Sequence, residues 1–168
     1  MQILTTTMAG QTVQAAMTDL GRYFQEHAII AEPAAFARAV AKREALGSTY
    51  IGAGIATPHY VAPGLTPTLV IARSQSPLAW PDGHTVHLCL VLVLPPGGAD
   101  AQMIKLMTAL ADATWLQRLS TATLPVIQEL IRQVMELVRE FSRYKINCAT
   151  VGCRHRRRCH QSIGRQAD

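Results

Sequence analysis

One histidine follows a glycine-rich run of small residues, and this setting suits the transfer of a chemical group. The segment reads GSTYIGAGIATPHY over residues 47–60, so His59 comes directly after Pro58. Proline fixes the backbone φ and removes a donor, so we expect Pro58 to present the imidazole from a stiff turn. The glycines at 47, 52 and 54 have no side chain to keep an incoming partner away. A histidine in such a place can accept a group on one ring nitrogen and pass it on.

Two kinds of hydrogen-bond donor precede His59 in the chain. Arg43 carries a planar guanidinium that matches phosphate oxygens. The Thr49 hydroxyl and the glycine-rich backbone are further donors. We therefore take His59, Arg43 and Thr49 as the candidate catalytic residues. Simpler interpretations stay open: an ion pair between Arg43 and Glu44 or another acid, a purely local role for Thr49, and an ordinary surface histidine after a strand.

Helical periodicity precedes this segment and would position it. Apolar residues recur at helical spacing from about 10 to 28, which predicts an amphipathic helix. A second helix is expected to open at Glu32-Pro33, with proline in its first turn, and to stop at Gly47. Arg43 would then lie at the C-terminal end of the second helix, a few residues before the glycines.

Strands are expected after these helices, at 51–56, 68–73 and 86–94. The third is apolar on both sides, which is typical of a strand covered by helices on both faces. Asp100 can cap a following helix that continues its apolar surface to Leu119, and a last helix starts at Thr123 with a buried face reaching Val138 and Phe141. The fold class is therefore α/β: a single compact domain with a mixed β-sheet flanked by α-helices.

The segment resembles the phosphorylation site of the enzyme IIA domains of the bacterial phosphoenolpyruvate-dependent sugar phosphotransferase system, in the fructose/mannitol class. The matching positions are the pair Arg43-Glu44, the pair Ser48-Thr49, and the run GAGIATPH over residues 52–59. The resemblance covers about residues 10–140. It implies the α/β order of elements given above and a phosphohistidine intermediate at His59.

The same resemblance implies the partners. The phosphoryl donor would be the histidine-containing phosphocarrier protein, and the acceptor a cognate enzyme IIB, which serves sugar uptake together with a membrane component IIC. Docking would use an apolar surface, for which Ile55, Tyr60, Val61 and the helix at 103–110 are candidates, although Met107 is expected in the core. The chain would be a phosphotransferase component, with no cofactor and no metal site.

The chain departs from the family pattern in one respect. Many relatives carry a second histidine at the start of the helix after the apolar strand, where this chain reads AQMIK over 101–105. Gln102 can donate a hydrogen bond there, but not from a cation. A regulatory role like that of the nitrogen-type relatives, in which phosphorylation alters protein–protein binding, is therefore the alternative. Of the remaining histidines, His84 is expected to be exposed and His87 to be structural.

Charge divides the chain into a body and a tail. Residues 1–141 hold nine Lys/Arg and ten Asp/Glu, a net charge of −1, whereas 142–168 hold seven Lys/Arg and one Asp, a net of +6. We expect the enzyme IIA domain at 1–141 and a disordered or accidental tail at 142–168. Its cysteines and histidines lack the paired spacing of zinc sites. Its arginine run at 154–158 leaves nucleic-acid binding open only as a lesser alternative, because the body is not basic.

The chain has no apolar run long enough to span a membrane and does not open with a secretion signal. We therefore expect a cytoplasmic protein without direct membrane insertion. Cys89 lies in an apolar run and is expected to be buried and inert.

Overall fold

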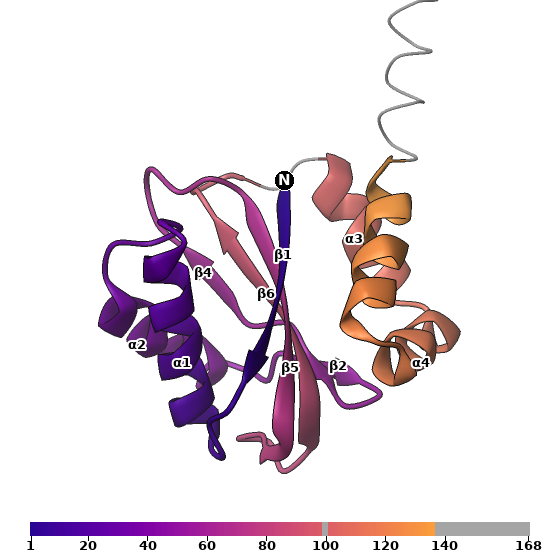
Figure 1. Cartoon of the computed structure of the whole chain (residues 1–168), viewed down its shortest axis with the longest axis horizontal. Coiled ribbons are helices and arrows are strands. Elements are labelled where there is room, and N and C mark those ends of the chain that lie inside the picture. The colour runs from indigo at the N-terminus through magenta and orange to yellow at the C-terminus, as the bar shows by residue number, and fades with distance from the viewer. Residues whose placement is uncertain (99–100, 137–168) are drawn as a thin grey trace, which may run out of the picture.

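A mixed β-sheet lies between two layers of helices (Figure 1). The computed structural model describes residues 1–98 and 101–136. Its elements in chain order are β1 (Gln2–Met8), α1 (Val13–Glu26), α2 (Pro33–Glu44), β2 (Tyr50–Gly52), β3 (Ile55–Ala56), β4 (His59–Val61), β5 (Thr68–Ala79), β6 (Thr85–Leu94), α3 (Ala101–Leu110) and α4 (Ala113–Thr121). A further helix begins at residue 124 and continues to the end of the described chain.

The long strand β6 organises the sheet. The strand order is β1-β5-β6-β3-β2, and β4 also pairs with β6. β5 runs antiparallel to β6, whereas β3 and β4 lie parallel to it at successive positions. β1 is parallel to β5 at the opposite edge. The predicted α/β class, with a mixed sheet flanked by helices, is confirmed.

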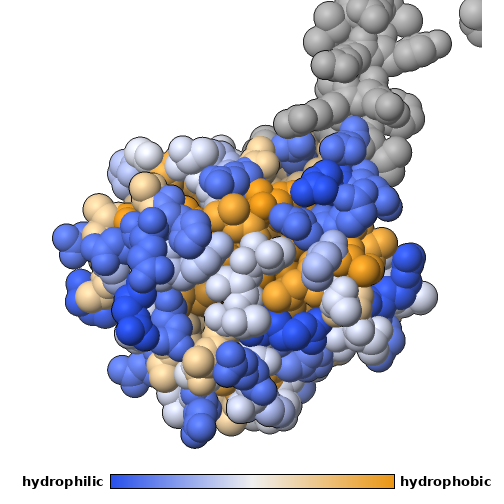
Figure 2. Space-filling view, in the orientation of Figure 1, coloured by the Kyte–Doolittle hydropathy of each residue, from blue (hydrophilic) through white to orange (hydrophobic). Residues whose placement is uncertain are grey.

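The sheet separates two hydrophobic cores, because neighbouring residues of a strand face opposite sides. Val70 and Ala72 of β5 pack under α1 and α2, whereas Leu69 and Ile71 pack under the other helical layer. α1 and α2 lie on the left of the sheet in Figure 1, and α3, α4 and the last helix on the right. Figure 2 shows hydrophobic surface in the strip between the two layers.

The helix signals in the sequence are borne out in part. α2 opens with Pro33, as expected, and α1 is capped by the Thr12 hydroxyl, which accepts from the Ala15 N–H at 3.2 Å. The single helix expected from Asp100 to Leu119 is wrong: Asp112 accepts from the Trp115 N–H and starts a separate α4. Asp100 itself, the positions of Val138 and Phe141, and the tail at 142–168 lie outside the described residues.

The strand predictions miss three features. The threonine-rich β1 was not expected, β5 extends to Ala79, and His59 opens the short strand β4. The strand expected at 51–56 is instead the hairpin β2–β3, in which Ala53 and Gly54 have φ of 51° and 72°. Positive φ at both central residues is the signature of a type I′ turn, whose twist matches the flanking strands.

Glycine is required at position 54 by its positive φ and also by the neighbouring His87 ring. A Cβ at this position would lie 2.1 Å from His87 Cε1. The glycine therefore admits the His87 ring, and we correct the expectation that Gly54 leaves the backbone open to a partner.

We expect Gly54→Ala to lower the free energy of unfolding by about 2 kcal/mol or more, because strain at positive φ adds to a steric clash. Gly64→Ala is the matched control: its φ is 76° and nothing lies within 4 Å of its added Cβ, so we expect only the backbone term of about 1 kcal/mol. Urea unfolding measures both. An equal loss of unfolding free energy in the two variants would show that the clash with His87 contributes nothing.

Candidate functional site

His59 lies in the short strand β4, beside the C-terminal end of β6. It pairs with Leu92 of β6, and the Leu92 N–H donates to the Pro58 carbonyl at 3.0 Å. Its side chain is half-buried. The expected stiff presentation therefore comes from pairing with a buried strand as well as from Pro58.

Arg43 reaches His59 from the last turn of α2. The Arg43 Nε–H donates to His59 Nε2 at 3.2 Å, and Arg43 Nη1 donates to the Gly47 carbonyl at 3.0 Å. A ring nitrogen that accepts a hydrogen bond carries no proton, so this geometry selects the tautomer with the proton on Nδ1. Nε2 thus has its lone pair directed at a guanidinium, which is where a phosphoryl group would need both a nucleophile and a cation.

Glu44 faces away from Arg43, into the protein, so the ion pair left open by the sequence is not formed. Its carboxylate is buried and accepts three hydrogen bonds: from the Thr49 N–H at 2.8 Å, the Thr49 hydroxyl at 2.6 Å and the Trp80 indole N–H at 2.6 Å. Three donors around one carboxyl group match an ionised acceptor. Burial of a charge is tolerated only with such compensation.

Thr49 belongs to this buried network. Its hydroxyl proton is committed to Glu44, and its carbonyl accepts from the Thr57 N–H at 2.9 Å and from the Thr57 hydroxyl at 3.3 Å. Thr57 stands two residues before His59. Thr49 therefore connects the end of α2 to the backbone that carries the histidine.

The β5–β6 turn contacts the same segment from outside. The His84 ring stacks on Tyr50 with centroids 4.1 Å apart, and His84 also pairs with Asp82 at 3.1 Å. A hydrogen bond from Ser48, together with the bonds and charge from His84, lowers the pKa of Asp82 below its usual value. His84 is exposed, as expected, but it is not isolated.

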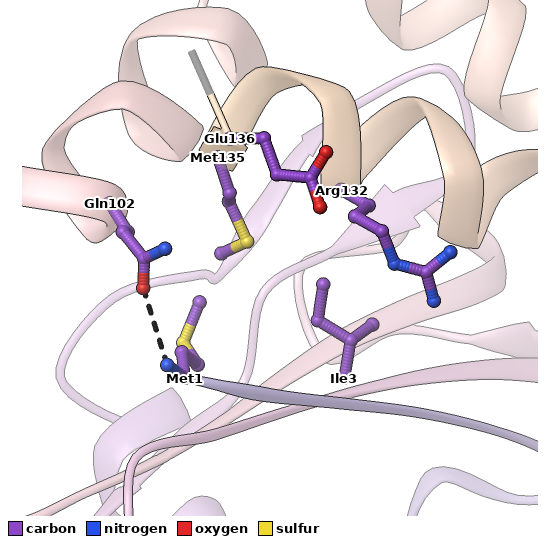
Figure 3. Close-up of a pocket in the computed structure, with 6 residues that line it drawn as sticks. All are labelled: Met1, Ile3, Gln102, Arg132, Met135 and Glu136. Carbon is purple, nitrogen blue, oxygen red and sulfur yellow. Dashed lines mark hydrogen bonds between the residues drawn. The ribbon is translucent and has the colours of Figure 1, made fainter. Parts of the chain in front are cut away.

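The other candidates lie elsewhere. The side-chain oxygen Oε1 of Gln102 accepts from the Met1 amino group at 3.2 Å, in a pocket of about 160 Å³ beside the last helix (Figure 3). His87 contacts the Ser120 hydroxyl at 3.0 Å, and burial, followed by the charge of Arg73, lowers its pKa. His87 therefore has the structural surroundings expected of it.

The expected docking residues divide by exposure. Ile55 is fully buried, whereas Tyr60 is half-buried and packs edge-on against Phe36. Val61 is 50% exposed, and Leu46, which the sequence did not single out, is 80% exposed just after α2. The expectation for Met107 is wrong: it is 43% exposed, and Met103 is the buried methionine of α3.

Sequence reasoning missed the roles of Glu44 and Trp80. Glu44 was noted only as part of a motif and as an ion-pair partner for Arg43, and burial of its carboxylate has no local signature. Trp80 lies 36 positions further along, and only the folded sheet brings its indole to Glu44.

Burial raises the pKa of the Cys89 thiol to about 12, and the nearby Glu44 charge adds to the effect. The thiol is thus inert at neutral pH, as expected. Within residues 1–98 and 101–136 no three His, Cys, Asp or Glu side chains gather as a metal site would need. In the same part of the chain no helix has the length and apolar character to cross a membrane.

Fold and site together describe an α/β domain built around an arginine-bound histidine at the end of a mixed sheet. The chain belongs to the enzyme IIA family of the bacterial sugar phosphotransferase system: the family model "Phosphoenolpyruvate-dependent sugar phosphotransferase system, EIIA 2" matches residues 2–137. This confirms the resemblance read from residues 43–59. Members of this family are phosphotransferase components.

Known proteins extend the comparison. Over 98 residues the chain is 36% identical to the 2-O-alpha-mannosyl-D-glycerate-specific EIIABC component of Escherichia coli, a match that covers 54% of this chain and 15% of that protein. The nitrogen regulatory protein IIA-Ntr of Neisseria meningitidis is similar in fold, with a TM-score of 0.58 and 23% identity over 80% of this chain and 92% of its own. The mannitol enzyme IIA of Escherichia coli, in complex with phosphorylated enzyme IIB, gives a TM-score of 0.54 and 19% identity over 76% and 94%.

The contact between Arg43 and His59 predicts the state of the ring. We expect the neutral form of the His59 ring to carry its proton on Nδ1, and Arg43→Met to increase the share of the Nε2–H form, because methionine has no N–H to donate to Nε2. Nitrogen-15 NMR of the imidazole measures both forms. A tautomer ratio that does not change in Arg43→Met would contradict this geometry.

Proposed function

We propose that this chain is a phosphoryl carrier, in which His59 accepts phosphate from the histidine-containing phosphocarrier protein and passes it to a cognate enzyme IIB for sugar uptake. The observation that carries the proposal is the hydrogen bond of 3.2 Å from Arg43 Nε to His59 Nε2. The phosphotransferase names of the relatives support it, as does the mannitol enzyme IIA in complex with phosphorylated enzyme IIB. The carrier would work in the cytoplasm, beside a membrane component IIC.

The proposed reaction uses the tautomer that the hydrogen bond from Arg43 selects. The Nε2 lone pair attacks phosphorus on the donor's phosphohistidine, a new N–P bond forms, and the donor's N–P bond breaks with its electron pair returning to the donor ring. His59 Nδ1 keeps its proton throughout. In the second step a nucleophile of enzyme IIB attacks the same phosphorus, and the pair of the His59 N–P bond returns to Nε2.

Arg43 has the charge that this transfer needs. Transition states of phosphoryl transfer are loose, so the protein chiefly positions groups and neutralises oxygens. When Nε2 becomes bonded to phosphorus, the Arg43 Nε–H loses its acceptor there, and the phosphoryl oxygens next to it become the new acceptors. Thr49 would not contact the phosphoryl group. It would position the site through its hydrogen bonds to Glu44 and to the backbone before His59.

Within this proposal the carrier domain is residues 1–141, with the basic segment 142–168 following it. The family match over residues 2–137 supports the extent of the carrier domain.

The central test is phosphorylation of the chain. Incubation with phosphoenolpyruvate, enzyme I and the phosphocarrier protein should add one phosphoryl group, seen by intact mass under alkaline conditions, and His59→Gln should abolish it. His27→Gln is the matched control, because His27 is an exposed histidine at the end of α1, and it should still be phosphorylated. A phosphate that persists in His59→Gln would refute the assignment of the histidine. For Arg43→Met we expect the transfer rate to fall about 100-fold, within the range found when one preorganised donor is removed.

Docking should depend on the exposed apolar residues near the site. Leu46 is adjacent to Gly47, whose carbonyl binds Arg43, and Val61 lies two residues after His59 on β4. We expect Leu46→Asp and Val61→Asp to raise the KM for the phosphocarrier protein about tenfold each, because each leaves a charge against an apolar partner surface. Val126→Asp, on the last helix and 49% exposed, is the control and should leave KM unchanged. An unchanged KM in both site variants would place docking elsewhere.

A regulatory role is the second candidate. The position of the second family histidine is taken by the AQMIK run, and Gln102 is engaged with Met1. A carrier receives and donates phosphate, whereas a regulatory module needs only to receive it. Chains that become phosphorylated but transfer nothing to any enzyme IIB encoded in the same genome would favour regulation.

A further inference from the structure

We propose that Trp80 is a positioning residue for phosphoryl transfer. It acts through Glu44 to keep the Arg43 and His59 side chains at the correct distance from each other. The inference rests on the proposed function of His59 and assigns to that site a residue from the β5–β6 turn. Trp80 touches neither Arg43 nor His59 in the contacts described above. Its influence runs through one buried carboxylate.

The carboxylate of Glu44 is the junction between Trp80 and Thr49. Two of its three donors come from Thr49, five residues away, and the third is the Trp80 indole N–H. Glu44 is 8% exposed and Trp80 is 3% exposed, so water cannot easily replace a missing donor. In the described part of the chain every buried side-chain nitrogen and oxygen has a partner. Loss of the indole N–H would leave Glu44 Oε1 with one donor in place of two.

Both members of the reactive pair are tied to this junction. Arg43 is the residue before Glu44, at the end of α2, so a shift of the Glu44 backbone moves the guanidinium. On the other side, Thr49 accepts both hydrogen bonds of Thr57, two residues before His59. A change in Glu44 therefore changes the distance between Arg43 and His59 from both ends. A misplacement of about 1 Å at a reacting centre can cost about 100-fold in rate.

The turn that bears Trp80 is stiff enough to serve as a reference point. The Trp80 N–H donates to the His84 carbonyl at 2.8 Å, and the Trp80 carbonyl accepts from the Gly83 N–H at 2.9 Å. Asp82 and His84 of the same turn contact Ser48 and Tyr50, which flank Thr49 on either side. The turn thus contacts residues 48 and 50 at the surface, while the Trp80 indole binds Glu44 in the interior.

The chain offers a matched pair of tryptophans for the test. Trp80 lies in the core under α1 and α2, whereas Trp115 lies on α4 beside the core on the other face of the sheet. Trp80→Phe and Trp115→Phe each replace an indole by a smaller apolar ring, but only the first removes a donor from Glu44. Single-turnover transfer from phosphorylated phosphocarrier protein gives the maximal rate and the concentration for half-maximal rate.

We expect Trp80→Phe to lower the maximal rate about tenfold or more and to leave the half-maximal concentration unchanged, because positioning and not docking is lost. Trp115→Phe should stay within about twofold of the parent chain. Trp80→Phe should also raise the share of the Nε2–H tautomer of His59, a signal that a loss of stability alone does not produce. A folded Trp80→Phe protein with the parent rate and tautomer ratio would overturn the proposal.

A double-mutant cycle shows whether Trp80 acts through Glu44. Glu44→Gln keeps one oxygen acceptor but loses the charge, so Trp80→Phe should have a smaller effect on rate in this background than in the parent chain. Additive effects on log rate would show an independent route and overturn the mechanism.

If Trp80→Phe does not fold, Trp115→Phe provides the second measurement, since Trp80 is then the sole tryptophan. Phosphorylation of His59 should change the emission of this indole, and no change would count against the coupling. Failure of the parent chain to become phosphorylated would instead refute the carrier function itself, so the two failures are distinguishable.

Discussion

The buried carboxylate of Glu44 sets the conditions that the site must meet. Removing a carboxylate from water costs several kcal/mol, and the cost is offset only where donors surround it in good geometry. Here those donors come from the segment after α2 and from Trp80 in the β5–β6 turn. The end of the helix, the entry to the β2–β3 hairpin and the β5–β6 turn must therefore meet at one point. Arg43 and His59 are placed by elements that converge for this electrostatic reason.

The sheet adds a second constraint, because β6 supports both short strands around the site. β3 pairs with Leu88 and Cys89, and β4 pairs with Leu92 to Leu94 further along the same strand. The chain between them, at residues 57 and 58, crosses the gap while staying bonded to Thr49 and Leu92. A half-buried histidine can thus lie in a short strand and still be fixed, since residues 88–94 of the strand beside it are apolar and almost all buried.

The sequence allowed prediction of the parts that depend on local signals. Pro33 at a helix start and the apolar run of β6 each carry their information within a few residues, and both were placed correctly. The GAGIATPH segment was sufficient to identify the family, but not to predict the hairpin and the short strand that it forms. β1 and β4 were missed because a threonine-rich strand and a three-residue strand are defined by pairing with a distant partner. The Trp80 contact failed for the same reason. The role of Thr49 was harder still, since its hydroxyl is equally suited to a phosphate and to a buried carboxylate.

The separation of the core by the sheet has a consequence for how this domain tolerates substitutions. The pair Arg43 and His59 and its support through Glu44 and Trp80 are built on the layer of α1 and α2, whereas α3, α4 and the last helix pack on the opposite face. Substitutions that are far apart and share no partners have nearly independent effects. Substitutions in the core of the second layer are therefore expected to have little effect on the relative positions of Arg43 and His59.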